Sequence, residues 1–248
     1  MNHKLLGKKI LITGGATGIG KASAIEMAKQ GAHVAILDIN EKGLSETKKQ
    51  ISEFNKNIEY WVTDVTSETE MRENISKAIK WLGNELNILA HFAGILEGSQ
   101  VDLENLDSKI WKKVIEVNLT GTFYSVKYSL PWLKKSKSVL LLTSSGAGVT
   151  GGGSAAPYSS SKGGTHGLTL WLEENLKNTE IRVHDILPGG IESPLKLGQL
   201  QEAFNNTGDK TIFEKNKQTL GKPEGVAKIV AFIASDDADY LRGSIKTR

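Results

Sequence analysis

The chain has 248 residues, no cysteine, and a formal net charge of +3. This length suits one large domain with a buried core, and the lack of cysteine excludes disulfides, thiolate catalysis and cysteine-ligated zinc. The basic residues are spread along the sequence rather than gathered in a block, so we expect neither nucleic-acid nor membrane binding.

Short apolar runs alternate with stretches of helical period along the chain. The predicted strands cover residues 9–13, 33–37, 58–62, 88–92, 138–143 and 181–187. The predicted helices cover residues 18–29, 41–54, 67–81, 106–134, 157–176 and 223–235, and residues 194–218 read as irregular or loosely helical. This alternation predicts an α/β fold: one doubly wound domain over residues 1–248, with a parallel sheet of about seven strands and helices on both faces.

A glycine-rich turn joins the first predicted strand to the first predicted helix. Residues 13–20 read Thr-Gly-Gly-Ala-Thr-Gly-Ile-Gly. Small residues let the backbone approach a phosphate, and a helix N-terminus directs free N–H groups and a positive dipole end at an anion. The turn therefore predicts a Rossmann-type dinucleotide site that includes Gly14, Thr17, Gly18, Ile19 and Gly20. The alternative is a tight turn that binds no ligand.

Asp38 follows the second predicted strand, 18 residues after Gly20. A carboxylate at this place can accept hydrogen bonds from the adenosine ribose and repels the 2′-phosphate of NADP. Thr17 and Ile39, two positions where a cation could offset that repulsion, are neutral. The sequence thus favours NAD over NADP, with a solvated turn residue as the alternative role of Asp38.

Tyr158 and Lys162 are four residues apart in a predicted helix and so share one face. An ammonium close to a tyrosine can lower its pKa from about 10 by roughly 1–3 units, so that it exchanges a proton with a substrate oxygen near neutral pH. Ser145 ends the preceding strand and could hydrogen-bond the same oxygen. Asn118 interrupts an apolar helix face, and a water chain to Lys162 would give it partners.

With these residues the sequence resembles the classical short-chain dehydrogenase/reductase family, from about residue 8 to residue 243. The matching motifs are T-G-x-x-x-G-x-G at 13–20, an acidic and an apolar residue at Asp64-Val65, A-G at Ala93-Gly94, the set Asn118, Ser145, Tyr158 and Lys162, P-G-x-I-x-S/T at 188–193, and a G-x-P-E segment at 221–224.

The resemblance implies a role for each matching residue. Tyr158 would be the general acid/base, Lys162 would lower its pKa and bind the nicotinamide ribose, Ser145 would orient the substrate oxygen, and Asn118 would hold a proton-relay water. Asp64 would bond the adenine, and Ile191 and Ser193 the carboxamide. Further cofactor contacts are expected at Val65, Phe92, Ala93, Gly94, Pro188 and Gly189. The family commonly forms tetramers, partly through the helices expected at 106–134 and 157–176, which implies a homo-oligomer, a tetramer or a dimer.

The sequence also departs from the family pattern. Phe92 stands where the family usually has Asn, so we expect a side-chain tie between strands to be lost, and His184 replaces a second family Asn. Relatives usually continue into a last strand that ends in V-D-G-G, and here Thr247 and Arg248 stand where that ending should begin. We therefore expect a shortened seventh strand and a weakened subunit interface.

Residues 192–218 are predicted to lie over the substrate pocket, either as a closing lid or as a helix pair that packs on the body. Leu96 and Phe204 indicate an apolar pocket. No Arg or Lys is obviously aimed at a carboxylate or phosphate, which favours a neutral substrate. The five histidines lack the spacing of metal ligands, so we expect no metal, and the N-terminus lacks a signal peptide, which predicts a cytoplasmic protein.

Three functions follow from this sequence. The favoured one is an NAD-dependent oxidoreductase that transfers a hydride between NAD(H) and a small secondary alcohol or ketone. A reductase of 3-oxoacyl thioesters on acyl-carrier protein is the alternative, although that class usually prefers NADPH. A regulatory protein that senses NAD without turnover is the third, but it would have no need of the four catalytic residues together.

Overall fold

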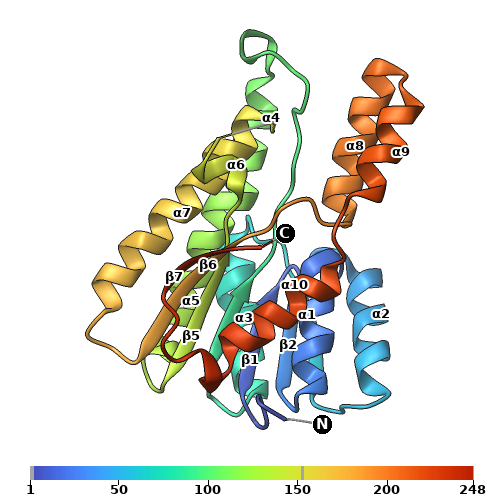
Figure 1. The fold of residues 1–248 in the computed structure, drawn as a ribbon. Coiled ribbons are helices and arrows are strands. Elements are labelled where there is room, and N and C mark those ends of the chain that lie inside the picture. Colours follow the sequence, from blue (N-terminus) through green and yellow to red (C-terminus); the bar gives the residue numbers. More distant parts are fainter. Residues whose placement is uncertain (1–2, 152–153, 248) are drawn as a thin grey trace.

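The computed structural model describes residues 3–151 and 154–247, and a parallel sheet lies at the centre of this part of the chain (Figure 1). The sheet has seven strands in the order β3-β2-β1-β4-β5-β6-β7, with parallel pairing throughout. The strands are β1 (Lys9–Thr13), β2 (His33–Asp38), β3 (Ile58–Val62), β4 (Ile88–His91), β5 (Ser138–Thr143), β6 (Ile181–Leu187) and β7 (Gly243–Lys246). The prediction of a doubly wound α/β fold is confirmed.

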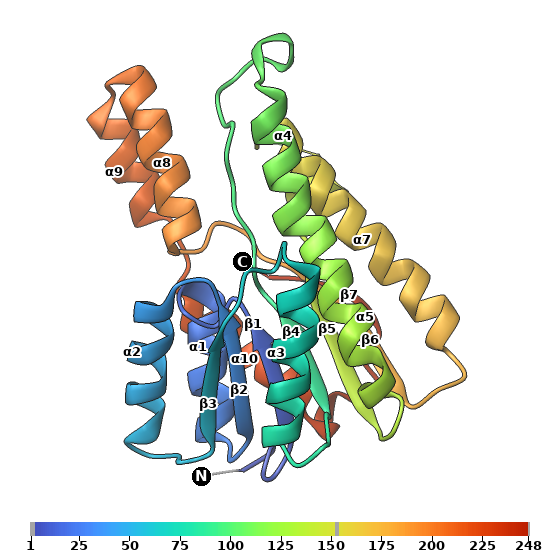
Figure 2. The same cartoon turned by 180° about the vertical axis from the view of Figure 1, so that it is seen from behind.

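Helices cover both faces of the sheet (Figures 1 and 2). One face carries α1 (Gly18–Lys29), α2 (Glu41–Ser52) and α10 (Pro223–Ala234), and the other carries α3 (Glu68–Trp81), α5 (Gly121–Leu133) and α7 (Ala156–Leu176). Each face of the sheet has its own hydrophobic core. Adjacent residues of a strand point to opposite faces, so Ile12 packs in the core beneath α1, α2 and α10, and Leu11 packs in the core beneath α3, α5 and α7. Each such buried side chain stabilises the fold by about 1.5–3 kcal/mol.

The remaining helical elements lie mainly in the loops that follow the strands. They are η1 (Leu103–Asn105), α4 (Ser108–Ile115), η2 (Glu116–Thr120), α6 (Gly146–Val149), α8 (Pro194–Thr207), α9 (Lys210–Gln218) and η3 (Asp236–Ala238).

The helix predicted over residues 106–134 is not one regular helix. The chain runs from α4 through a π-helical turn, η2, into α5. Asn118 lies inside this wide turn, and its side chain bonds to the backbone of Ile95 on the neighbouring loop. Wide turns of this kind occur at functional sites, because they re-aim one side chain without ending the helix.

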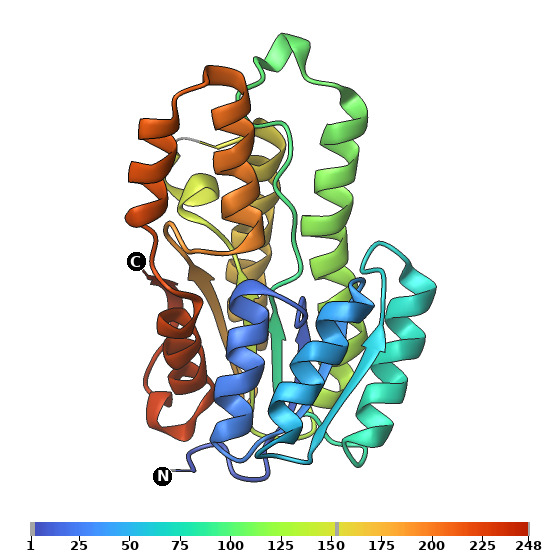
Figure 3. The same cartoon turned by 90° about the vertical axis from the view of Figure 1, so that its right-hand side faces the viewer.

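The prediction that residues 194–218 are irregular or loosely helical is wrong. They form a hairpin of two helices, α8 and α9, which projects beyond the carboxyl edge of the sheet (Figure 3). The hydroxyl of Ser193 accepts a hydrogen bond from the backbone N–H of Lys196 at 3.3 Å, and Pro194 occupies the first turn of α8. Gly208, with φ 70°, then reverses the chain after α8.

The seventh strand forms where it was predicted, with four residues that pair with β6. His184 of β6 is fully buried, and its Nδ1 lies 3.2 Å from the carbonyl oxygen of Gly243 at the start of β7. Burial lowers the pKa of His184 to about 4, so the ring is neutral at physiological pH and donates its N–H to Gly243. This histidine therefore holds the edge strand to the sheet.

Candidate active site

The order of the strands reverses between β1 and β4, and a cleft of about 830 Å³ lies at their carboxyl ends. Ligands bind at this reversal point in open α/β sheets. The cleft is lined by every residue predicted above to contact the cofactor, from Gly14 to Ser193, and also by Ser145. Asn118 is not on the cleft wall but lies behind it.

The glycine turn at the base of the cleft has no room for side chains. A Cβ on Gly14, which has φ 76°, would lie 2.5 Å from the backbone nitrogen of Ala93, and a Cβ on Gly20 would lie 2.0 Å from the carbonyl oxygen of Gly14. Helix α1 begins at Gly18, and the side chain of its N-cap Thr17 makes no capping hydrogen bond. The first N–H groups of α1 thus remain available at the cleft, which fits the phosphates of a dinucleotide.

Asp38 lines the cleft at the end of β2 and also braces the glycine turn. Its Oδ2 accepts a hydrogen bond from the backbone N–H of Ala16 at 3.1 Å, and its Oδ1 accepts one from Asn40 at 3.0 Å. Ile39 is exposed beside it. The carboxylate therefore has a fixed orientation at the position where the adenosine ribose is expected.

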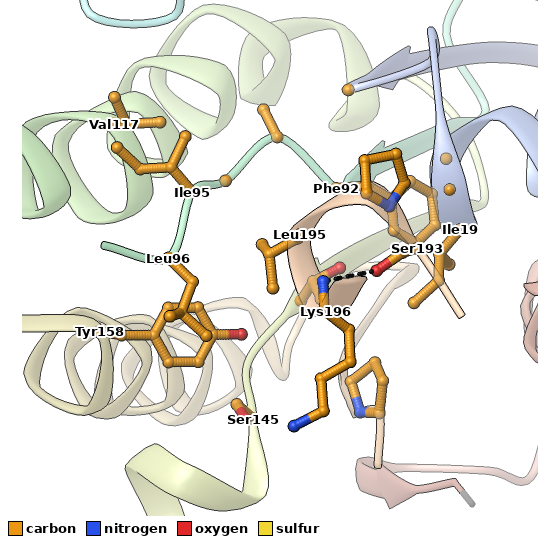
Figure 4. A pocket seen from close by; sticks show the side chains of 18 of the residues that line it. Ile19, Phe92, Ile95, Leu96, Val117, Ser145, Tyr158, Ser193, Leu195 and Lys196 are labelled. Carbon is orange, nitrogen blue, oxygen red and sulfur yellow. Dashed lines mark hydrogen bonds between the residues drawn. The ribbon is translucent and has the colours of Figure 1, made fainter. Parts of the chain in front are cut away.

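Tyr158 of α7 and Ser145 of the loop after β5 line the end of the cleft that lies away from the glycine turn (Figure 4). Burial raises the pKa of Tyr158, and a hydrogen bond with Ser145 lowers it by a smaller amount. The sequence led us to expect a pKa lowered by Lys162. The structure differs, because desolvation of the phenol outweighs the other influences on its pKa.

Lys162 is buried below Tyr158, with its ammonium 5.8 Å from the centre of the Tyr158 ring. The ammonium donates a hydrogen bond to the carbonyl oxygen of Thr143 at 2.8 Å, and burial lowers its pKa to about 8. A Cβ on Gly94 would lie 3.5 Å from this nitrogen. A side chain at position 94 would therefore lie in contact with the ammonium.

Asn118 uses its side chain to position the loop after β4. Its Oδ1 accepts from the N–H of Ile95 at 2.8 Å, and its Nδ2 donates to the carbonyl oxygen of Ile95 at 2.9 Å and to Ser161 Oγ at 3.0 Å. These bonds occupy both N–H donors of the amide. The side chain thus fixes the cleft wall, while the water expected from the family resemblance stays a prediction.

The loss of a side-chain tie at Phe92 is compensated from the next strand. Thr143 Oγ1 donates a hydrogen bond to the carbonyl oxygen of His91 at 2.7 Å and so joins β5 to β4. His91 is fully buried, and its Nδ1 contacts Thr13 Oγ1 at 2.6 Å and Ser125 Oγ at 3.0 Å. The strands are therefore joined by side chains other than the one at position 92.

Some residues of the site were not found from the sequence. Ser144 is buried and donates from its Oγ to the carbonyl oxygen of Lys162 at 2.9 Å, and Lys196 lines the cleft from the first turn of α8. The Ser193-Pro194 pair, which is typical of a helix start, was the available signal for the position of Lys196. Leu96 lines the cleft as expected, but Phe204 packs on Phe213 of α9 with ring centres 5.6 Å apart.

Residues 3–151 and 154–247 contain neither a metal site nor a membrane-spanning helix. No group of three or more His, Cys, Asp or Glu side chains in this part of the chain is placed to hold a metal ion. None of its helices has both the length and the apolar character needed to cross a membrane.

A family model, a related sequence and two solved structures all match this chain over most of its length. The family model for short chain dehydrogenases matches residues 8–202. A 3-oxoacyl-[acyl-carrier-protein] reductase of Thermotoga maritima is 32% identical over 243 residues, which are 98% of this chain and 96% of that protein.

Solved structures agree with that match. The crystal structure of a levodione reductase has a TM-score of 0.91 at 27% identity and covers 98% of this chain and 96% of its own. An actinorhodin polyketide ketoreductase variant with NADPH has a TM-score of 0.89 at 26% identity and covers 97% of this chain and 95% of its own. This chain belongs to the short-chain dehydrogenase family, whose members are oxidoreductases that bind a nicotinamide cofactor.

Proposed function

We propose that the protein transfers a hydride between NAD(H) and a small secondary alcohol or ketone, with Tyr158 as the general acid/base. The observation that carries this proposal is that the side chains of Tyr158 and Ser145 face one another at one end of a cleft that begins at a glycine turn. Two hydroxyls at one point can bind one substrate oxygen. The nicotinamide supplies or accepts the hydride.

Ser145, Tyr158 and Lys162 each have a separate part in the proton transfer to the substrate oxygen. Ser145 donates a hydrogen bond that orients the carbonyl, and Tyr158 gives its phenolic proton to the oxygen as the alkoxide forms. The buried ammonium of Lys162 supports the resulting phenolate. Burial raises the pKa of Tyr158, so the phenol holds the proton that it gives to the substrate oxygen.

We infer NAD as the cofactor from Asp38. Its carboxylate lines the cleft and accepts hydrogen bonds from the backbone N–H groups of Ala16 and Asn40, which fix its orientation. The 2′-phosphate of NADP would therefore be repelled by this negative charge. The neutral residues Thr17 and Ile39 line the same part of the cleft and offer that phosphate no cation.

We also propose that the α8–α9 hairpin closes over the substrate and that the protein is a homo-oligomer. Pro194, Leu195, Lys196 and Gln199 of α8 line the cleft, which supports the first point. On α5 and α7, Phe123, Leu170 and Trp171 are between 46% and 59% exposed. Large apolar side chains on two long helices support a subunit interface there.

Two other functions compete with this proposal. The Thermotoga relative reduces an acyl-carrier-protein thioester according to its name, and that activity would favour NADPH and a long substrate. An NAD sensor would bind the cofactor without turnover. The Tyr158–Ser145 pair supports an enzyme over a sensor, since cofactor binding alone requires neither hydroxyl.

The test is the Tyr158→Phe variant, assayed with NADH against a panel of ketones and 3-oxoacyl thioesters. We expect the variant to bind NADH as the wild type does but to lose turnover by a factor of about 100 or more. NADH binding is followed by the fluorescence of the bound nicotinamide, which serves as the control for folding. Wild-type protein that binds NADH and reduces nothing in the panel would exclude the proposal in favour of a sensor.

A further inference from the structure

The first turn of α8 sends a lysine into the substrate end of the cleft. Lys196 is half-buried and lines the cleft, and its backbone is held by the hydrogen bond to Ser193. In Figure 4 its side chain extends from α8 toward the wall that carries Ser145 and Tyr158, and away from Ile19 of the glycine turn. The amine therefore lies on the side of the substrate rather than on that of the cofactor phosphates.

No carboxylate of the described residues neutralises this lysine. Its Nζ donates to the neutral Oε1 of Gln199 at 2.7 Å, and no ion pair within 4.0 Å is found for it in this part of the chain. The other two lysines on the cleft wall differ, since Lys113 pairs with Glu97 at 2.6 Å and Lys162 donates to Thr143. Lys162 also has no carboxylate partner among the described residues, but it is buried beside Tyr158. Lys196 is thus the lining lysine outside the Tyr158 pair whose charge is not matched by a carboxylate of the described residues.

The acidic groups of the cleft lie at its other end. Asp38 and Asp64, the two carboxylates on the wall, follow β2 and β3, where the adenosine is expected. Lys196 is half-buried, so its ammonium has lost part of its hydration, and this loss lowers its pKa. An incoming anion would compensate this loss, and the attraction would be stronger here than in open water.

The surroundings of Lys196 indicate the kind of anion. Leu195, the residue before it, lines the cleft, and so does Leu96 beside Tyr158, while no arginine of residues 3–151 and 154–247 lines it. A phosphate is usually held by several donors or by the paired donors of an arginine, whereas a single ammonium with apolar neighbours suits one carboxylate on a carbon skeleton.

We propose that Lys196 binds a carboxylate of the substrate, so that the preferred substrates are oxo acids and hydroxy acids rather than neutral ketones and alcohols. This inference rests on the proposed function and replaces the neutral substrate expected from the sequence. The sequence did not point to Lys196, because a lysine in a polar segment is usually a solvated residue and its position in the cleft depends on how α8 is placed.

The test compares 4-oxocyclohexanecarboxylate with its methyl ester, in the presence of NADH, for the wild type and for Lys196→Gln. The two ketones differ in charge at one end, so the ratio of their kcat/KM values isolates recognition of the carboxylate. We expect the wild type to prefer the acid. In Lys196→Gln the ratio should fall by about tenfold or more, mainly through the KM of the acid, and Lys196→Arg should restore part of it.

Lys215→Gln is the matched control, because Lys215 is an exposed lysine on the neighbouring helix α9 and does not line the cleft. It should leave the acid-to-ester ratio at the wild-type value. The inference is overturned if Lys196→Gln keeps the ratio, or if it weakens NADH binding and affects both ketones equally, which would place Lys196 on the cofactor.

A binding experiment separates this inference from the proposed function. Cyclohexanecarboxylate, which has no ketone, is titrated calorimetrically into the NADH complexes of the wild type and Lys196→Gln. We expect binding to weaken by about tenfold or more in the variant and also in the wild type at high salt. Turnover of the ester with no preference for the acid would refute the inference alone. Absence of any turnover, with binding that depends on Lys196, would refute the proposed function alone.

Discussion

The ammonium of Lys162 lies 5.8 Å from the centre of the Tyr158 ring, and its hydrogen bond goes to the carbonyl oxygen of Thr143. The lysine is thus anchored to β5, and the tyrosine to α7, before any substrate is present. Lys162 is buried and Tyr158 is half-buried, so a charge on either side chain keeps only part of its hydration.

The first prediction concerns stability and pH. Burial lowers the pKa of Lys162 from 10.5 to about 8, so between these pH values the unfolded chain binds a proton that the folded chain has lost. The free energy of unfolding should therefore rise with pH across this window. Relative to Lys162→Met, the wild type should gain on the order of 3 kcal/mol between about pH 8 and pH 10.5.

Urea unfolding of the cofactor-free proteins at several pH values measures this difference. Because all other titrating groups are present in both proteins, their contribution drops out of the difference in the free energy of unfolding between the wild type and Lys162→Met. A difference that stays constant with pH would contradict the lowered pKa of Lys162.

The second prediction concerns cofactor choice. Replacement of Asp38 by Asn keeps the shape of the side chain and removes its negative charge. We expect the wild type to prefer NADH, and we expect the ratio of kcat/KM for NADH to that for NADPH to fall by about tenfold in Asp38→Asn. Steady-state assays with both cofactors and one ketone give the ratio. Equal use of both cofactors by the wild type would count against NAD.

The third prediction concerns Asn118. Its replacement by Ala leaves the N–H and the carbonyl oxygen of Ile95 without their partner in a buried site. Such groups cost free energy, so we expect the free energy of unfolding to fall by about 2–4 kcal/mol. Asn205→Ala removes an exposed hydrogen bond to Gln201 and should cost less than about 0.5 kcal/mol. Equal losses in both variants, measured by urea unfolding, would show that Asn118 does not support the cleft wall.

The fourth prediction concerns assembly. A glutamate in place of Trp171, which is 59% exposed on α7, would put charge into the proposed interface. We expect the molar mass in light scattering to fall to that of a smaller oligomer or a monomer. Leu6→Glu changes a similarly apolar residue, 73% exposed near the N-terminus, and should leave the mass unchanged. A monomeric wild type would remove the basis of this prediction.

The sheet and the glycine turn could be predicted because their signals are local. Continuous apolar runs such as residues 138–143 are typical of strands buried on both faces, and the turn at Gly14 excludes side chains by backbone contact alone. Tyr158 and Lys162 share a face because of helical spacing. In each case the physical cause acts within a few residues of the chain.

The features that were missed depend on packing between distant segments. The pKa of Tyr158 is raised because its phenol is desolvated, and the spacing of Tyr158 and Lys162 in the sequence does not reveal that desolvation. The tie from Thr143 to His91 joins two strands that are 52 residues apart in sequence. The position of Lys196 in the cleft depends on α8, a helix whose regularity was itself underestimated.

The wide turn at residues 116–120 makes the site sensitive to the length of the chain as well as to its composition. A π turn holds one residue more than an α turn, because its hydrogen bonds run from i to i+5 rather than from i to i+4, so deletion of one residue from this segment would restore a regular turn between α4 and α5. The helix would become straighter, yet Asn118 would no longer face Ile95. Homologues that lack one residue here would then need a different anchor for the loop after β4, even where the asparagine itself is retained.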